Sequence, residues 1–357
     1  MHHSQLRTVA AIPAFHASRR PTATALVCQG RALDYAALHR ESNRAGHALR
    51  AAGLRPGARV AYLGRESEHY YEILFGCAKS GTVLVPVNWR LTAAEVRHIL
   101  ADSGTELLFV EREFHDSVAR IRDELPDLRH LVVTDRDGEP GAGYRAWAAT
   151  GSDDELDAGT GPDDPIAQIY TSGTTGLPKG VVLAQRSFFA VRDLLAAHGL
   201  DWIDWRAGDV SLVAVPGFHI GGLWWALQGL SAGVTNVVMR MFADGDAVDL
   251  IREHRVTTTC MVPAMLQMVL AEPRVGPADF ASLRKVVYGG SPISESLLGS
   301  CLATMRCEFA QIYGLTETGK HRGLPAAGRA RRGRVPPTGG RSAVPGGRGA
   351  DRRPRRR

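Results

Sequence analysis

The chain has 357 residues, of which 44% are hydrophobic and 22% charged, a composition that suits a large globular core or two domains. Its net charge of +6 is unevenly placed: residues 320–357 hold thirteen Lys and Arg and one acid, and residues 1–319 hold 30 basic and 36 acidic residues. A mildly acidic body gives no reason to expect a specific nucleic acid or an anionic membrane as partner.

Helical and strand patterns alternate through the first part of the chain. Residues 34–53 space their apolar residues by three and four, as an amphipathic helix does. The pattern then predicts strand 58–64, helix 68–81, strand 82–88, helix 92–104, strand 106–111, helix 114–126 and strand 130–135. This βαβα order predicts a mostly parallel sheet with helices on both faces.

Residues 136–164 interrupt the alternation with Gly, Pro and Asp, and they predict a surface connection between two subdomains, roughly 1–160 and 161–319. The alternation then resumes. Strands are predicted over 165–173, 180–184, 209–217, 235–240, 257–265, 283–291 and 308–317, and helices over 186–199, 221–232, 244–255 and 293–305. No fixed-period repeat is visible, which argues against a solenoid or a propeller.

The stretch YTSGTTGLPKG, residues 170–180, is the clearest chemical motif. It directly follows an apolar strand, its glycines allow backbone N–H groups to approach an anion, and Lys179 adds a compact positive charge. Its hydroxyl donors are Thr171, Ser172, Thr174 and Thr175. The motif is not a Walker loop, because Pro178 and Gly180 flank the lysine. Composition alone also fits a flexible surface turn, but the order and position favour a phosphate site.

Five ordered motifs together resemble the adenylate-forming superfamily, which includes acyl-CoA synthetases, luciferases and peptide-synthetase adenylation domains. They are VPVNWRLTAAEVRHIL (85–100), YTSGTTGLPKGV (170–181), VPGFHIGG (215–222), VVYGGSPIS (286–294) and QIYGLTETG (311–319). The resemblance covers essentially residues 1–319. It implies an α/β fold in which two mixed, mostly parallel sheets are flanked by helices in αβαβα layers.

The resemblance also implies an activity. A carboxylic acid would react with ATP to give an acyl-adenylate and pyrophosphate, and the thiol of coenzyme A would then take the acyl group. The implied partners are therefore the acid, ATP and coenzyme A, with Mg²⁺ as the metal. Because two anions meet in the first step, such a site must supply compensating positive charge.

Residue roles follow from the matched motifs. The β- and γ-phosphates would lie against Thr171, Ser172, Gly173, Thr174, Thr175, Gly176 and Lys179. Glu317, with Thr174, would bind Mg²⁺, which prefers oxygen ligands. Thr316 would contact the α-phosphate, and Tyr313 and Gly314 would lie against the adenine. Lys179, Thr316, Glu317 and His219 are the catalytic candidates. A solvated loop acid is the alternative for Glu317, and a core aromatic is the alternative for Tyr313.

Two further motifs concern the acyl side of the site. Gly289, Gly290 and Ser291 would line the passage between the adenine and acyl pockets, although a glycine turn with Ser291 or Ser294 capping a helix also fits. His219 would have a positioning or gating role.

The segment after His219 bears on the substrate. Amino-acid-activating relatives place an aspartate in this segment, and none is present here. Apolar side chains at Phe218, Leu223, Trp224 and Trp225 favour a fatty or aryl acid, although both tryptophans also suit a core.

The sequence after Gly319 differs from the rest. Residues 320–357 hold twelve arginines, eight glycines and five prolines, so they are expected to be disordered. They are interpreted as a frameshift product or, alternatively, as an arginine-rich arm for RNA or acidic partners. Residues 1–319 are then expected to be an incomplete AMP-binding N-terminal domain, without the small C-terminal domain of the family and with impaired activity. A non-catalytic nucleotide- or acyl-binding relic and a basic-tailed nucleic-acid binder are the competing hypotheses.

The cysteines and the N-terminus bear on location. The five cysteines are scattered without a C-x-x-C pair, which favours buried reduced thiols in a cytoplasmic protein. We expect no signal peptide and no membrane span, since no apolar run approaches the roughly 20 residues that a span needs. Peripheral membrane contact and the oligomeric state stay open.

Overall fold

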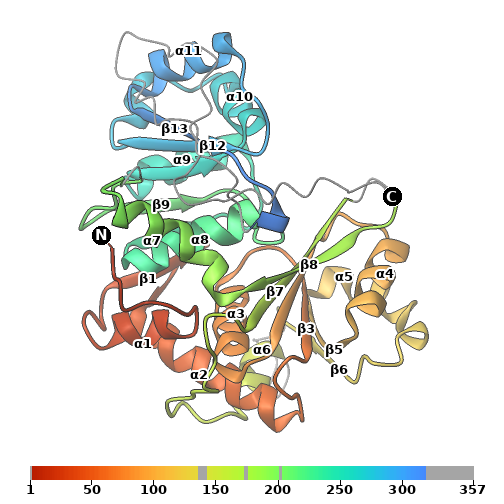
Figure 1. Ribbon diagram of the computed structural model, residues 1–357. Coiled ribbons are helices and arrows are strands. Elements are labelled where there is room, and N and C mark those ends of the chain that lie inside the picture. The colour runs from red at the N-terminus through yellow and green to blue at the C-terminus, as the bar shows by residue number, and fades with distance from the viewer. Residues whose placement is uncertain (1, 136–142, 173–175, 201–202, 319–357) are drawn as a thin grey trace, which may run out of the picture.

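The computed structural model describes residues 2–135, 143–172, 176–200 and 203–318. Gly173, Thr174, Thr175 and the basic segment 320–357 lie outside the described residues. Within those ranges the strands form two sheets of seven and six strands, with helices packed on both (Figure 1). The prediction of two mainly parallel sheets flanked by helices is confirmed.

The seven-stranded sheet has the order β13-β12-β11-β9-β10-β1-β2. Its strands are β1 (Thr24–Cys28), β2 (Arg31–Asp34), β9 (Val210–Val213), β10 (Thr235–Val238), β11 (Thr258–Met261), β12 (Lys285–Gly289) and β13 (Glu308–Ile312). Neighbouring strands are parallel except for the antiparallel pair β1 and β2. The carboxyl ends of its parallel strands therefore meet at one edge.

The six-stranded sheet has the order β6-β5-β3-β4-β7-β8. Its strands are β3 (Arg59–Leu63), β4 (Val83–Val87), β5 (Thr105–Val110), β6 (His130–Val133), β7 (Pro165–Thr171) and β8 (Lys179–Ala184). Only β7 and β8 are antiparallel among these strand pairs. Each sheet thus uses strands from both sides of residue 160, and the subdomain boundary near that residue stays a prediction.

The helices cover both sheets. They are α1 (Ala11–Ala17), α2 (Tyr35–Ala51), α3 (Glu68–Ser80), α4 (Ala93–Ser103), α5 (Arg112–Ala119), α6 (Gly143–Ala148), α7 (Ala190–Ala197), α8 (Ile220–Ala232), α9 (Asp244–Glu253), α10 (Pro263–Ala271) and α11 (Glu295–Met305). Short 3₁₀ turns are η1 (Arg122–Glu124), η2 (Gln185–Phe188), η3 (Pro277–Phe280) and η4 (Thr316–Thr318). Among the described residues, no helix combines the length and the apolar character needed to cross a bilayer.

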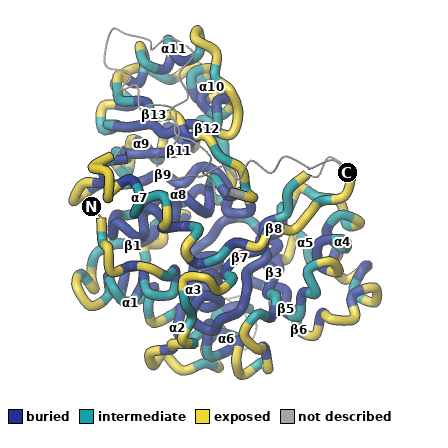
Figure 2. Tube along the Cα trace, viewed as in Figure 1, coloured by how far each residue is buried: buried dark blue, intermediate teal, exposed yellow. Residues whose placement is uncertain are grey.

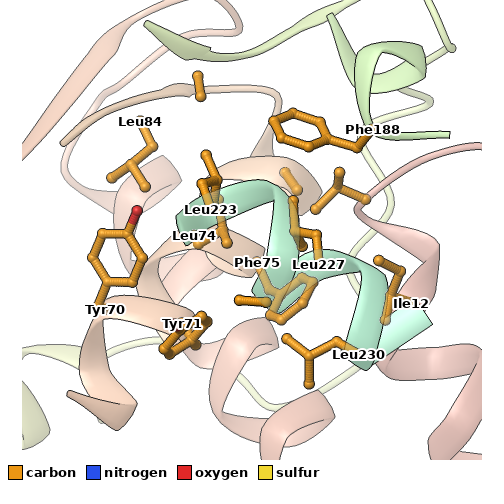
Figure 3. Close-up of a cluster of buried hydrophobic side chains, with 14 of the residues drawn as sticks. Ile12, Tyr70, Tyr71, Leu74, Phe75, Leu84, Phe188, Leu223, Leu227 and Leu230 are labelled. Atoms are coloured by element: carbon orange, nitrogen blue, oxygen red, sulfur yellow. The ribbon is translucent and has the colours of Figure 1, made fainter. Parts of the chain in front are cut away.

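Helices α3 and α8 form the centre of the core. All thirteen residues of α3 are buried, and so is every residue of α8 except Gly221. Figure 3 shows Leu74 and Phe75 of α3 close to Leu223 and Leu227 of α8. Figure 2 shows the same elements dark blue while the outer helices carry exposed stretches. Helix α8 is apolar on nearly all sides, which suits such an interior layer, whereas α3 also buries Glu68, His69, Glu72 and Lys79.

Local sequence explains where several helices begin. The hydroxyl of Thr92 accepts the backbone N–H of Glu95, and the Glu95 carboxylate accepts the backbone N–H of Thr92, which completes a capping box at α4. The carboxylate of Asp34 accepts the N–H of Ala37 at 2.7 Å and caps α2. Both helices therefore begin where the sequence predicts.

Several expectations needed correction, among them the predicted strand 308–317, which ends at Ile312 before the turn η4. The predicted helix 114–126 ends at Ala119 in α5 and continues only as the turn η1, and the predicted helix 186–199 is divided into η2 and α7. The predicted strand 257–265 ends at Met261, because Pro263 lacks an N–H group and instead opens α10. The connection 136–164 contains α6, whose Tyr144 side chain is fully buried. The helix α1 and the hairpin of β1 and β2 had not been predicted.

Candidate active site

The β7–β8 hairpin carries the phosphate-type motif. Thr171 pairs with Lys179 across the antiparallel strands, and residues 172–178 connect them. Gly176 has φ of +98°, which is the left-handed region that glycine adopts without strain. Ser172, Gly176 and Lys179 are all exposed. The described part of the loop therefore presents a hydroxyl, a glycine and an ammonium to solvent.

Helix α4 holds this hairpin from one side. Tyr170 donates its hydroxyl to the Asp102 carboxylate at 2.6 Å, and that bond together with burial raises the pKa of Tyr170. The His98 ring, through Nε2, bonds to the Pro178 carbonyl oxygen at 3.0 Å. The loop is thus anchored immediately before and after its exposed part.

The segment after β13 reaches the same hairpin. The Thr171 hydroxyl donates to the Glu317 carboxylate at 3.4 Å, although 146 residues separate the two. Figure 1 shows η4, the short dark-blue turn that contains Glu317, between the upper sheet and β8. The contact puts the metal candidate and the phosphate-loop candidate in one place.

Tyr313 lies on the surface just before η4. It is 57% exposed, so the alternative reading as a core aromatic is wrong. Gly314 and Thr316 are intermediate in burial and flank the exposed Leu315. An exposed aromatic ring beside Glu317 leaves a flat face on which a base could stack.

Gly289, the last residue of β12, permits close packing with β13, and Gly290 follows it. A Cβ on Gly289 would lie 2.4 Å from the Ile312 carbonyl oxygen, so a larger residue has no room there. Gly290 has φ of +88°. Ser294, rather than Ser291, caps α11 by accepting the Leu297 N–H at 3.2 Å. Ser291 is exposed next to these glycines and does not cap the helix.

His219 stands at the N-terminal end of α8. Its backbone N–H donates to Pro216 O at 3.0 Å, and its carbonyl accepts the N–H of Gly222 at 3.0 Å. The residue keeps an exposed surface while its neighbours Phe218 and Ile220 are buried. Partial desolvation of the ring lowers the pKa of His219, and the positive charge of Arg90 lowers it further. The imidazole is therefore neutral at physiological pH and can accept or donate a hydrogen bond.

Arg90 is a site residue that the sequence analysis missed. Its guanidinium lies 4.4 Å from the centre of the Trp89 ring, and Arg65 lies 4.9 Å from the same ring. Arg65 also pairs with Glu113 on the protein surface. The only available signal was the position of Arg90 inside the motif 85–100. It adds a second cation, after Lys179, to the candidate residues.

Other residues of the acyl side are buried. Trp225 is 1% exposed and donates its Nε1–H to Leu212 O at 3.2 Å, which supports its core role. Trp224, the residue before it in α8, lines a cavity that encloses about 560 Å³ of empty space, its open mouth included. Apolar side chains of Val191, Leu195, Leu200, Ile203 and Trp205 line the cavity together with the polar His2, Arg192 and Gln228. It lies on the α7 side of α8 and away from the Thr171–Glu317 contact.

The candidate residues fit a metal only in part. Among the described residues, no group of three or more His, Cys, Asp or Glu side chains could hold an ion unaided. The exposed carboxylate of Glu317 is a hard oxygen donor of the kind that Mg²⁺ accepts alongside nucleotide oxygens. The structure therefore allows a metal that arrives with a phosphate ligand.

Comparison with known proteins gives the chain a family. A model of the AMP-binding enzymes matches residues 14–345. A fatty acid–[acyl-carrier-protein] ligase of Streptomyces coeruleorubidus, ScoC, is 63% identical over 320 residues, which are 89% of this chain and 60% of that protein. An indoleacetate–CoA ligase of Aromatoleum aromaticum is 38% identical over 306 residues, 85% of this chain and 59% of the relative.

Solved structures agree with this comparison. The N-terminal domain of FACL13 from Mycobacterium tuberculosis superposes with a TM-score of 0.80 at 29% identity, covering 90% of this chain and 79% of that domain. The chain spans about 60% of the length of the two curated relatives. It belongs to the AMP-binding enzyme family.

Proposed function

We propose that the chain activates an apolar carboxylic acid with ATP and passes the acyl group to a thiol. A carboxylate oxygen attacks the α-phosphorus, the bond from that phosphorus to the bridging oxygen breaks, and pyrophosphate leaves with the electron pair. The thiol sulfur then attacks the acyl carbon, loses its proton, and AMP leaves. The family match over residues 14–345 supports this reaction class.

The Thr171–Glu317 contact is the observation that carries the proposal. A hydroxyl from the glycine-rich hairpin and a carboxylate from the turn after β13 lie within one hydrogen bond of each other. Phosphate oxygens need donors such as the Thr171 and Ser172 hydroxyls, and a metal that arrives with the phosphates would be held by a carboxylate such as Glu317. Magnesium would supply charge neutralisation at this position.

Chain groups would do the remaining work in the first step. Lys179 would offset charge on the β- and γ-phosphates, together with Thr171, Ser172 and the loop through Gly176. Thr316 would bind the α-phosphate and Tyr313 would stack on the adenine. His219, neutral and next to Arg90, would hold the acid in position for attack rather than remove a proton.

The thiol acceptor follows from the relatives. The 63%-identical protein is a ligase for an acyl-carrier protein, whereas the 38%-identical one is a CoA ligase. We therefore propose the phosphopantetheine thiol of a carrier protein as the acceptor, with coenzyme A as the alternative. Mass spectrometry after incubation with ATP, Mg²⁺, decanoate and each acceptor decides between them. Acylation of coenzyme A alone would contradict the carrier protein.

The acid is expected to be fatty or aryl. The segment 215–225 offers no carboxylate for a substrate ammonium, and α8 is apolar on every side. Calorimetry with decanoate, benzoate and phenylalanine tests the class, and binding by phenylalanine alone would refute it.

The nucleotide site is tested by binding, with Glu317→Gln as the main variant. We expect magnesium-dependent ATP affinity in the unaltered chain and a loss of at least roughly tenfold in the variant, since it removes a charged ligand while keeping the shape. Glu253→Gln, which changes a carboxylate on α9 with 69% side-chain exposure, is the matched control. Equal affinity in all three proteins, or none in the unaltered chain, would contradict the assignment. ATP binding without pyrophosphate release would favour a non-catalytic binder.

A further inference from the structure

Glu66 is a buried carboxylate outside the matched motifs. It follows β3 and precedes α3, and it is 5% exposed. Its Oε1 accepts the backbone N–H of Gly217 at 2.7 Å, and its Oε2 accepts the hydroxyl of Tyr71 at 3.0 Å. Both oxygens are therefore used inside the protein, one of them by a residue 151 positions away.

The backbone of Glu66 makes two more contacts with the other sheet. Its N–H donates to Arg240 O at 3.2 Å, and its carbonyl oxygen lies 3.9 Å from the Cys28 sulfur, which donates. Cys28 ends β1, Arg240 follows β10, and Gly217 follows β9, and these are three adjacent strands of the seven-stranded sheet. One residue in the connection after β3 thus contacts the last residue of one strand and the segments that follow two neighbouring strands of the seven-stranded sheet, at the carboxyl ends where α/β proteins commonly place their ligand sites.

The turn that Glu66 holds leads directly to His219. A Cβ on Gly217 would lie 2.5 Å from the Tyr70 hydroxyl, so the turn cannot move toward α3. Val215 and Phe218 are buried on either side. The Pro216 carbonyl accepts the His219 N–H, which links the anchored glycine to the histidine. Displacing Gly217 must therefore displace His219.

We propose that Glu66 is a positioning residue that holds the turn 215–219 and thereby sets where the His219 imidazole lies. The inference rests on the proposed function for the role of His219, whereas the contacts among Glu66, Gly217 and His219 are independent of that function. A hydrogen bond to an ionised carboxylate is roughly twice as strong as a neutral one, so the strength of the hydrogen bond from Gly217 depends on the charge of Glu66.

The surroundings of Glu66 make that charge sensitive to pH. Burial raises the pKa of Glu66 to about 7, hydrogen bonds from Gly217 and Tyr71 oppose the rise, and the negative Glu111 adds to it. The other titratable groups around it are Tyr62 in β3, Tyr70 on α3, Cys28 on β1, Glu68 on α3, and the Arg240 guanidinium, which pairs with Glu111. The hydrogen bond from the Gly217 N–H to the Glu66 carboxylate should therefore strengthen as pH rises through neutrality.

Two substitutions separate the anchor from the charge. Glu66→Met fills nearly the same volume without an acceptor, and Glu66→Gln keeps an acceptor without the charge. Glu72→Gln is the matched control, because Glu72 is also fully buried on α3 but pairs with Arg145 and His69 instead. The readouts are amide hydrogen exchange at Gly217 and the NMR titration of the His219 ring, in the whole chain without ligands.

We expect Glu66→Met to speed hydrogen exchange of the Gly217 amide by roughly tenfold or more, which is the factor for one lost charged hydrogen bond. We also expect it to shift the pH midpoint of the His219 ring titration. Glu66→Gln should retain most of the protection of the Gly217 amide against exchange. It should also abolish the titration of the Gly217 amide chemical shift near neutrality. Equal behaviour of the Met and Gln variants, or an equal effect of Glu72→Gln, would overturn the proposal.

If the Met variant does not fold, the proposal is still tested by the pH titration of the Gly217 amide shift in the unaltered chain. A Gly217 amide shift that does not titrate between pH 5 and pH 9, or that titrates equally in Glu66→Gln, refutes the proposal. Because these readouts need neither ATP nor acid, failure of the proposed function would be seen separately.

Discussion

Lys79 offers a quantitative test of the packing between α2 and α3. It is 1% exposed at the end of α3, and its Nζ donates to Asn43 Oδ1 and lies 2.9 Å from His39 Nδ1. Burial lowers the pKa of Lys79 from 10.5 to about 8, and the partly exposed Glu155 at 3.8 Å raises it only in part. The folded chain therefore releases this proton more easily than the unfolded chain does.

The sign of the effect follows from proton binding. Between pH 8 and pH 10.5 the unfolded chain holds more protons at this lysine, so the contribution of Lys79 to stability rises with pH. At about 1.4 kcal/mol for each pH unit between the two values, the contribution of Lys79 to the free energy of unfolding rises by about 2.5 kcal/mol from pH 7 to pH 10. His39, whose pKa burial lowers, is uncharged over this window and adds no slope.

Lys79→Met removes the titrating group and should remove the gain. Urea unfolding of the unaltered chain and the variant at pH 7, 8, 9 and 10 gives the difference in free energy directly. The exposed Lys179→Met is the control, and it should leave the slope intact. A difference between Lys79→Met and the unaltered chain that stays constant from pH 7 to pH 10 would refute the reasoning.

Two packing predictions can be checked by thermal unfolding. Ser294→Ala should cost about 1 kcal/mol by removing the α11 cap, whereas Ser291→Ala should change little. Gly76→Ala should cost about 1–3 kcal/mol, because its Cβ would lie 2.7 Å from Ala45 Cβ and would push α2 from α3. Gly299→Ala on α11 meets nothing within 4 Å and should instead stabilise by about 0.5–1 kcal/mol. Equal losses at both glycines would show that helix–helix contact is not the cause.

Local signals made much of the fold predictable. The capping box at Thr92 and the Asp34 cap lie within one helical turn of the residues that they fix, so a sequence pattern contains them completely. The hairpin of β1 and β2 escaped prediction because its five- and four-residue strands are short and β1 joins the sheet through β10, more than 200 residues away. The buried Tyr144 of α6 was hidden in a segment rich in Gly and Pro.

In the candidate site too, sequence motifs were predictable and contacts between distant residues were not. The order of the motifs led to Thr171 and Glu317, which the structure brings into contact. Glu66 stands in the polar stretch RESE, which looks like an exposed turn, and its partner Gly217 cannot be inferred from spacing. Arg90 lay inside a recognised motif, yet its proximity to His219 depends on how two loops from different sheets converge.

The pairing of β1 with β10 has a consequence for synthesis of the protein. Leu26 pairs with Asn236, so the first hairpin emerges from the ribosome long before its neighbour in the sheet exists. At a typical elongation rate of 5–20 residues per second, the wait is roughly 10–40 seconds. During that time the edge of β1 that later pairs with β10 has no partner strand. The nascent chain should accordingly depend on chaperones, and slow translation should raise its tendency to aggregate.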